Sequence, residues 1–217
     1  MRLHTFVGSP NGRKVEAVIN HLGLAVEIDY RDVFEGGLRA PDYLALNPNA
    51  MAPTLVDGSF VLWESTAIMQ YLADKAGGED LFPRDLQRRA DVVRWQCWEL
   101  THFNRAFGTI VLEVLVNPSL GRGATNQALV DVARAELSQL APVLDRHLAD
   151  RRHLVGDGIT IADYSMICLE PYKGAIPFDW MPYPSLNAYF DRMRRVEAWA
   201  RTAPADSGAV GRKPKAA

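Results

Sequence analysis

The chain has 217 residues, 48% of them hydrophobic and 23% charged, so it is long enough to bury a sizeable core and too apolar to be disordered throughout. The formal net charge of −2 supplies no broad basic surface for nucleic acid or an anionic membrane, which favours a small molecule or a protein as the partner. Residues 1–10 lack the apolar segment of a signal peptide, and the apolar stretch 107–116 is short. Cys97 and Cys168 are too far apart for a disulfide framework or a zinc site, so we expect a cytoplasmic protein without a metal.

The first eighty residues alternate between strand and helix patterns. Apolar spacing and turn residues predict, in chain order, a strand over 2–7, a helix over 9–23, a strand over 26–33, a hairpin of two strands over 53–62 and a helix over 64–78. The region 35–50 is looser and has room for a short helix. The hairpin turns at Asp57-Gly58, a dipeptide that accepts positive φ angles. These elements predict an α+β domain over residues 1–78.

Strand signals cease after the linker near residue 80, and helical spacing predominates. It predicts helices over 87–116, 126–150, 157–169, 185–196 and 197–202, which form an all-α domain over 86–202. Pro142 can kink the second of these helices. Residues 203–217 combine Pro, Gly and Ala with Lys and Arg, a composition that cannot pack a core, so we expect a flexible tail there.

Three short segments in the first domain carry candidate chemistry. In the turn Ser9-Pro10-Asn11-Gly12, Ser9 and Asn11 either cap the following helix or present hydrogen-bond donors to a ligand. Pro53 is either an ordinary edge-strand proline or a cis-proline that exposes the main chain of Ala52.

The third segment is Glu64-Ser65, which precedes an apolar helical run. Ser65 serves there as a plain cap, or the helix start holds a ligand carboxylate while Glu64 accepts from an ammonium group.

The second domain holds two further motifs. Thr160 and Asp163 have the spacing of a capping box, and we assign them to folding. In the run 94–107 we assign the aromatic residues Trp95, Trp98 and Phe107 to the core.

The same run contains His102, Phe103 and Arg105, which are candidate pocket residues. No nucleophile elbow surrounds a serine, and no glycine-rich loop joins a strand to a helix, which disfavours serine hydrolysis and nucleotide binding.

The order of these motifs is more specific than any one of them. A Ser-Pro-Asn turn after the first strand, "NPNAMAPTLVDG" before the hairpin, "ESTAI" at a helix start and "GITIADY" in a helical half together resemble a cytosolic glutathione transferase (GST) of a bacterial type. The resemblance covers about residues 1–202. It implies a thioredoxin-like N-terminal domain that binds glutathione, an all-helical GST C-terminal domain that supplies much of the co-substrate pocket, and a homodimer.

The resemblance also implies roles for individual residues. Pro53 takes the place of the family's cis-proline, and Ala52 pairs with the cysteinyl part of glutathione as an added strand does. Glu64 and Ser65 grip the γ-glutamyl group. Ser9 contacts the sulfur of glutathione.

In one bacterial branch of the family an asparagine two residues after that hydroxyl also reaches the sulfur, and Asn11 occupies its place. Thr160 and Asp163 match the family's folding cap.

Two features depart from the family's pattern. Met51 stands where members often carry a Lys, Gln or Arg that reaches the peptide, so Arg39 or Lys14 must bind the glycyl carboxylate, or that contact is weak. No cysteine lies in the N-terminal domain, which excludes a mixed disulfide through Ser9.

Three functions follow from the resemblance. The first is an enzyme in which Ser9 and Asn11 activate the glutathione thiol for attack on a hydrophobic electrophile or a peroxide, in a pocket between the domains. The second is a disulfide reductase that uses two glutathiones and no protein cysteine. The third is a binding or scaffold protein that keeps the fold without efficient turnover.

Overall fold

The computed structural model describes residues 1–206, 208 and 210–213, and these fall into two compact units. Unit 1 comprises Met1–Phe82 together with the described residues from Arg195 onward, and unit 2 comprises Pro83–Arg194. The first boundary agrees with the predicted linker. The second lies earlier than the predicted end of the helical domain at residue 202.

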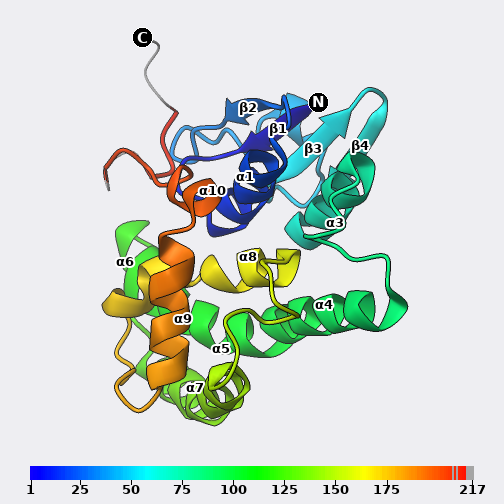
Figure 1. The fold of residues 1–217 in the computed structure, drawn as a ribbon. Coiled ribbons are helices and arrows are strands. Elements are labelled where there is room, and N and C mark those ends of the chain that lie inside the picture. The colour runs from blue at the N-terminus through cyan, green and yellow to red at the C-terminus, as the bar shows by residue number, and fades with distance from the viewer. Residues whose placement is uncertain (207, 209, 214–217) are drawn as a thin grey trace. The chain divides into compact units, whose positions relative to one another are not determined.

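Unit 1 contains a four-stranded mixed sheet with the strand order β2-β1-β3-β4 (Figure 1). Its elements up to Phe82 are β1 (Arg2–Thr5), α1 (Pro10–Leu22), β2 (Glu27–Tyr30), α2 (Pro41–Leu44), β3 (Thr54–Asp57), β4 (Phe60–Trp63) and α3 (Ser65–Ala76). β1 pairs parallel with β2 and antiparallel with β3, and β3 pairs antiparallel with β4. The predicted order of elements is therefore confirmed, with shorter strands than the sequence patterns indicated.

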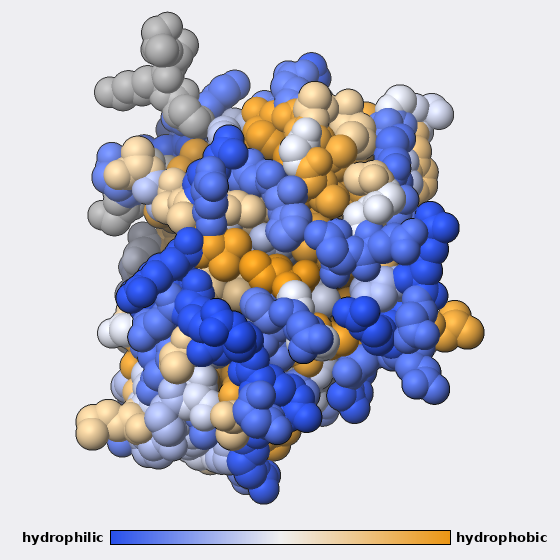
Figure 2. Space-filling model, viewed as in Figure 1, coloured by the Kyte–Doolittle hydropathy of each residue, from blue (hydrophilic) through white to orange (hydrophobic). Residues whose placement is uncertain are grey.

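The core of unit 1 lies between the sheet and its helices. The side chains that are completely buried there include Leu3, Val15, Val18, Leu55, Ile68, Met69 and Leu72. Helix α1 packs against α3 and also against α10 (Glu197–Ala200). Figure 2 shows several apolar patches on the face drawn. The exposed apolar side chains of unit 1 include Met51, Phe60 and Trp63.

Helix α10 belongs to unit 1, although the sequence placed residues 197–202 in the helical domain. The Arg13 guanidinium lies 4.1 Å from the ring centre of Trp199, and its Nε donates to Thr202 Oγ1 over 3.0 Å. Asn20 also donates to the main-chain oxygen of Ala198. Apolar spacing identifies a helix but not the surface that it covers, so these contacts had no signal in the sequence.

The predicted tail also differs from the structure. Gly211 donates its N–H to the Val7 oxygen over 2.8 Å, and its own oxygen accepts from Val33 N over 2.7 Å. The N–H of Lys213 donates to Asp32 Oδ2. Main-chain hydrogen bonds thus fasten 210–213 to the segments that follow β1 and β2. Positions 207, 209 and 214–217 of the predicted flexible tail lie outside the described residues.

Unit 2 is helical throughout its regular elements. They are α4 (Leu86–Trp98), a π-helical segment (Glu99–Phe103), α5 (Asn104–Val111), a second π-helical segment (Leu112–Val116), α6 (Asn117–Ser119), α7 (Gln127–Leu148), α8 (Ile161–Ile167), a 3₁₀ segment (Glu170–Ala175) and α9 (Pro184–Arg194). The predicted helix over 87–116 is interrupted by the two π-helical segments. Helix α7 packs against α5 and α9, and α4 packs against α8. In the described residues, none of the helices combines the length and the apolar character needed to cross a membrane.

Candidate functional site

The turn that leads into α1 uses Ser9 as its N-cap. Ser9 Oγ accepts a hydrogen bond from Gly12 N over 3.0 Å, and the side chain is only 2% exposed. Gly12 is required for this packing, because a Cβ at that position would lie 2.1 Å from Thr5 Oγ1. The hydroxyl oxygen therefore caps the helix, while the hydroxyl proton has no acceptor in the part of the chain that the structure describes.

Asn11 connects this turn to the start of α3. Its Oδ1 accepts a long hydrogen bond of 3.5 Å from the hydroxyl of Ser65. With the oxygen oriented toward Ser65, the amide group of Asn11 keeps its two N–H groups as donors. Two segments 54 residues apart, each a predicted site segment, are thus joined within unit 1.

The peptide bond between Ala52 and Pro53 is cis. Pro53 is buried and directly precedes β3, whereas Ala52 is half-buried. The main chain of Ala52 forms no hydrogen bond with any other described residue, so its N–H and C=O can both pair with an extended ligand.

Two residues that the sequence analysis missed hold the loop before Pro53. The hydroxyl of Tyr43 donates to the Met51 oxygen, and Asn47 Nδ2 donates to the same oxygen over 2.8 Å. Both side chains also contact Thr54 Oγ1, at 3.0 and 3.1 Å. Burial raises the pKa of Tyr43, which keeps its hydroxyl protonated as a donor. The only sequence signal was the position of Asn47 in "NPNA", which we interpreted as a loop.

Glu64 has an unusual backbone conformation at the start of α3. Its φ of 73° lies in the left-handed region, which costs a non-glycine residue about 1–3 kcal/mol, and residues with such strain cluster at functional sites. Glu64, rather than Ser65, is the N-cap, and its side chain forms no capping bond. Its exposed carboxylate has no ion-pair partner in the described residues. The interpretation of Ser65 as a plain cap is therefore wrong, because Ser65 is the first helical residue and is 5% exposed.

The two candidates for the glycyl carboxylate have different accessibility. Lys14 is completely buried in unit 1 and is not available to a ligand at the surface. Arg39 is exposed and forms no ion pair among the described residues. Met51, at the position where the family often has a donor, is 66% exposed. Arg39 is thus the accessible cation of the two.

The predicted capping box is present in unit 2. Asp163 Oδ2 accepts from Thr160 N over 2.8 Å and from Thr160 Oγ1 over 3.0 Å. Its Oδ1 accepts from Leu154 N and from the Tyr189 hydroxyl, so both carboxylate oxygens are occupied. Burial raises the pKa of Asp163, and these hydrogen bonds oppose that effect. The pair stabilises the start of α8 and touches no candidate site residue.

The three predicted pocket residues of unit 2 lie in different environments. Phe103 is completely buried and stacks between Trp98 and Phe107, at ring-centre distances of 5.5 and 6.3 Å. His102 is exposed, and Arg105 is exposed and paired with Glu136 over 2.9 Å. A shared role for these residues in a pocket stays a prediction. No group of three or more His, Cys, Asp or Glu side chains suited to a metal ion occurs in the described part of the chain.

The fold and the site together define a class of protein. A four-stranded sheet with a cis-proline before β3 is a thioredoxin-like arrangement, and here a helical unit follows it. Residues 3–80 match the family model for the glutathione S-transferase N-terminal domain, and residues 103–197 match the model for the C-terminal domain. The chain belongs to the glutathione S-transferase family.

Similar proteins support this classification over most of the chain. Glutathione S-transferase 3 of Zea mays is 37% identical over 204 residues, which cover 92% of this chain and 86% of that protein. Glutathione transferase F7 of Populus trichocarpa is 25% identical, with a TM-score of 0.85 and coverage of 93% and 96%. A theta-class enzyme of Xanthomonas axonopodis, solved with glutathione bound, is 29% identical, with a TM-score of 0.83 and coverage of 93% and 96%.

Proposed function

We propose that this chain is a glutathione transferase that binds glutathione in unit 1, activates its thiol as a thiolate and transfers it to a hydrophobic electrophile. The observation that carries the proposal is the Ser9 hydroxyl, whose oxygen caps α1 while its proton has no acceptor in the described residues. That proton can be donated to the thiolate of glutathione bound at the start of α1, a helix of 13 residues whose N-terminus also favours a negative charge.

Hydrogen bonds and the N-terminus of α1 can supply the free energy needed to lower the pKa of the glutathione thiol. A free thiol has a pKa of about 8.5, and lowering it by about two units requires a preference for the thiolate of about 2.7 kcal/mol. A hydrogen bond to a charged group contributes about 1.5–3 kcal/mol, and a helix N-terminus adds about 0.3–1 kcal/mol. We assign Ser9 as the principal donor and Asn11, through its amide N–H groups, as the helper.

The rest of the glutathione molecule is bound by residues of the same unit. The main chain of Ala52, next to Pro53, pairs with the cysteinyl residue as an added strand. The carboxylate of Glu64 accepts from the γ-glutamyl ammonium, and Ser65 with the start of α3 binds the γ-glutamyl carboxylate. Arg39 binds the glycyl carboxylate.

The remaining assignments extend the proposal to the co-substrate and the assembly. The pocket of the hydrophobic electrophile includes His102, Phe103 and Arg105. A peroxide is an alternative substrate, which two glutathione molecules reduce. We propose a homodimer in the cytoplasm, with no metal. The Ser-Pro-Asn turn favours the bacterial branch, although the relatives include plant enzymes at up to 37% identity.

The test is the thiol pKa of bound glutathione, measured from thiolate absorbance across pH. We expect a value well below that of free glutathione in the wild type and a rise of about one unit or more in Ser9→Ala, which corresponds to about 1.4 kcal/mol. Asn11→Ala gives a smaller rise. Ser59→Ala, in the exposed turn between β3 and β4, is the matched control and leaves the pKa unchanged. An unshifted pKa in the wild type contradicts the mechanism and leaves a binding protein with a GST fold.

A disulfide reductase is the second candidate, because unit 1 contains no cysteine and Asn11 is present. In that reaction one glutathione thiolate attacks the disulfide, a second resolves the mixed disulfide, and two thiols and glutathione disulfide are released. The comparison is the rate with 1-chloro-2,4-dinitrobenzene against the rate with 2-hydroxyethyl disulfide. Faster turnover of the disulfide favours the second candidate.

A further inference from the structure

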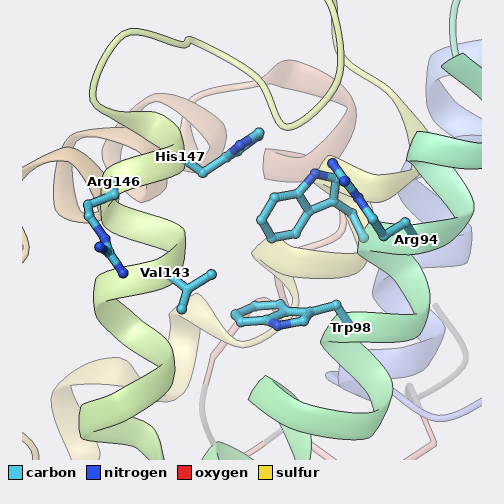
Figure 3. A pocket seen from close by; sticks show the side chains of 6 residues that line it. Arg94, Trp98, Val143, Arg146 and His147 are labelled. Carbon is cyan, nitrogen blue, oxygen red and sulfur yellow. The ribbon is translucent and has the colours of Figure 1, made fainter.

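Two pockets within unit 2 differ in the chemistry of their linings. Figure 3 shows that aromatic, arginine and valine side chains line the pocket between α4 and α7. A second pocket, of about 520 Å³, is lined by Glu170, Pro171, Lys173, Gly174, Trp180 and Arg194. This second pocket contains a primary amine, which is a nucleophile when it is neutral. It shares no residue with the candidate glutathione site.

Lys173 is held where the 3₁₀ segment meets α9. Its Nζ donates to Asn187 Oδ1, and its main-chain oxygen accepts from Trp180 Nε1 over 3.1 Å. Asn187 Nδ2 donates in turn to the Trp180 oxygen over 2.8 Å. A neutral amine keeps two N–H groups, so the bond to Asn187 persists while the lone pair is free to react. These contacts fix the position of the amine at the pocket.

The surroundings of Lys173 favour the neutral amine. Its side chain is half-buried, and no carboxylate among the described residues forms an ion pair with it. Burial lowers its pKa, and the charge of Arg194 acts in the same direction, whereas Asp191 and Glu170 oppose both effects. These two carboxylates are themselves paired with Arg194, which weakens their attraction for the amine. The Trp180 ring centre lies 5.7 Å from Nζ, near the outer limit of a cation–π contact, so the ring stabilises the charged form only weakly.

The other described lysines lie in different environments. Lys14 is completely buried, and Lys213 is exposed. Lys75 forms an ion pair with Asp57. The hydrogen bond to Asp57 raises the pKa of Lys75, which keeps its amine charged. Lys75 is therefore an internal reference for the reactivity of Lys173.

We propose that Lys173 is a site of covalent acylation, which takes its acyl group from a small acyl phosphate. Nζ attacks the acyl carbon, the N–C bond forms, the C–O bond to the phosphate breaks, and inorganic phosphate leaves with the electron pair. The amine proton passes to water. Arg194, whose exposed guanidinium lines the same pocket, attracts the phosphate group of the donor. The proposal does not depend on the glutathione chemistry of unit 1.

The test incubates the full chain with acetyl phosphate and measures the acetylated fraction of each lysine by mass spectrometry of its peptides. At about pH 8 we expect the initial rate at Lys173 to exceed that at Lys75 about tenfold, and the rate at Lys173 to level off at a lower pH. Lys173→Arg removes the signal and thereby assigns it. Equal rates at Lys173 and Lys75, or a faster reaction at Lys213 than at Lys173, overturn the proposal.

Asn187→Asp tests whether the pocket activates the amine. The variant places a carboxylate against Nζ, which keeps the amine protonated, so acetylation of Lys173 is expected to slow about tenfold while the rate at Lys75 is unchanged. Ala188→Asp adds the same charge at the next position of α9, which is exposed, and is the control with a change of less than about twofold.

Arg194→Gln tests the pocket without touching the Asn187 bond. It removes the partner of the phosphate and releases two carboxylates to attract the amine, so acetylation of Lys173 is expected to slow about threefold. Arg134→Gln is the matched control, because Arg134 also pairs with an aspartate three residues before it, on α7. Far-UV circular dichroism checks that each variant is folded. An unchanged rate at Lys173 in both Asn187→Asp and Arg194→Gln refutes the assignment.

Discussion

Ser9 shows how one side chain serves two roles without conflict. Its oxygen accepts from Gly12 and begins α1, and its proton stays available for a ligand. The sequence left capping and chemistry as alternatives, because both use the same residue types at a helix start. The direction of the hydrogen bonds decides between capping and chemistry. That direction follows from atomic coordinates and cannot be read from the spacing of residues in the sequence.

Glu64 combines backbone strain with a proposed role in binding glutathione. The substitution Glu64→Gly tests both, because it relieves the strain and removes the carboxylate. We expect Glu64→Gly to leave the chain as stable as the wild type, or more stable by up to about 1 kcal/mol, because glycine adopts a φ of 73° without a Cβ clash. Glutathione binding falls at the same time, since the carboxylate is lost. Urea unfolding and calorimetry with glutathione measure the two effects.

Glu64→Gln is the control that distinguishes the effect of strain from the effect of the carboxylate, because it keeps the strained backbone and removes only the charge. It is expected to weaken glutathione binding without a gain in stability. A large loss of stability in Glu64→Gly contradicts the role of strain, and unchanged glutathione affinity in both variants contradicts the role of the carboxylate.

Asp163 is the residue whose replacement is expected to destabilise unit 2 most directly. Its two oxygens accept four hydrogen bonds, and Asp163→Asn replaces one oxygen by a donor that faces other donors. We expect a loss of about 2–3 kcal/mol in the free energy of unfolding, measured in urea. Asp157→Asn, at an exposed position of the preceding loop, is the control and should change stability by less than about 0.5 kcal/mol.

At the scale of elements, the C-terminal segment 210–213 is tied to the start of the candidate site. Gly211 bonds Val7, two residues before Ser9, and also bonds Val33. Val210 packs on Gly8, where an added Cβ would lie 2.9 Å from a Val210 methyl group. The segment thus supports the main chain on the N-terminal side of the Ser9 turn, the proposed thiol-activating turn.

Deletion of residues 207–217 is therefore expected to raise the KM for glutathione about threefold or more and to raise the pKa of the bound thiol. A deletion of 214–217 alone keeps the bonds of Gly211 and is the control. Kinetics at varied glutathione and the absorbance titration supply the two readouts. An unchanged KM and pKa in the longer deletion means that the turn holds its position without the segment.

Helices and strands differed in how well the sequence predicted them. The order of the elements along unit 1 was predicted from the β-α-β pattern and the Asp57-Gly58 hairpin, and the α+β and all-α halves were recognised from periodicity. The order of the strands in the sheet was not predicted, because the antiparallel pairing of β1 with β3 has no signal in those patterns. The interruptions of the predicted helix 87–116 were missed, because π-helical turns keep helical spacing on either side. The bracing of the Pro53 loop by Tyr43 and Asn47 was missed, because it joins polar side chains to a main-chain oxygen, which leaves no apolar pattern.

At the scale of the whole molecule, the proposed glutathione site uses residues of unit 1. This site could be outlined from sequence, because its residues cluster in three short motifs. The partial exposure of Trp98 in unit 2 could not, because Trp95 and Trp98 both have the spacing of core residues, whereas Trp95 is buried and Trp98 is only half-buried.

Unit 1 is discontinuous along the chain, and this sets the order in which it can be completed during translation. Arg13 and Asn20 of α1 leave the ribosome early, whereas their partners on and beside α10 follow only after all of unit 2 has been made. At ribosomal speed that interval is on the order of ten seconds, during which one face of α1 is uncovered. A premature stop codon within unit 2 therefore also leaves unit 1 incomplete, even though every strand of its sheet has already been synthesised.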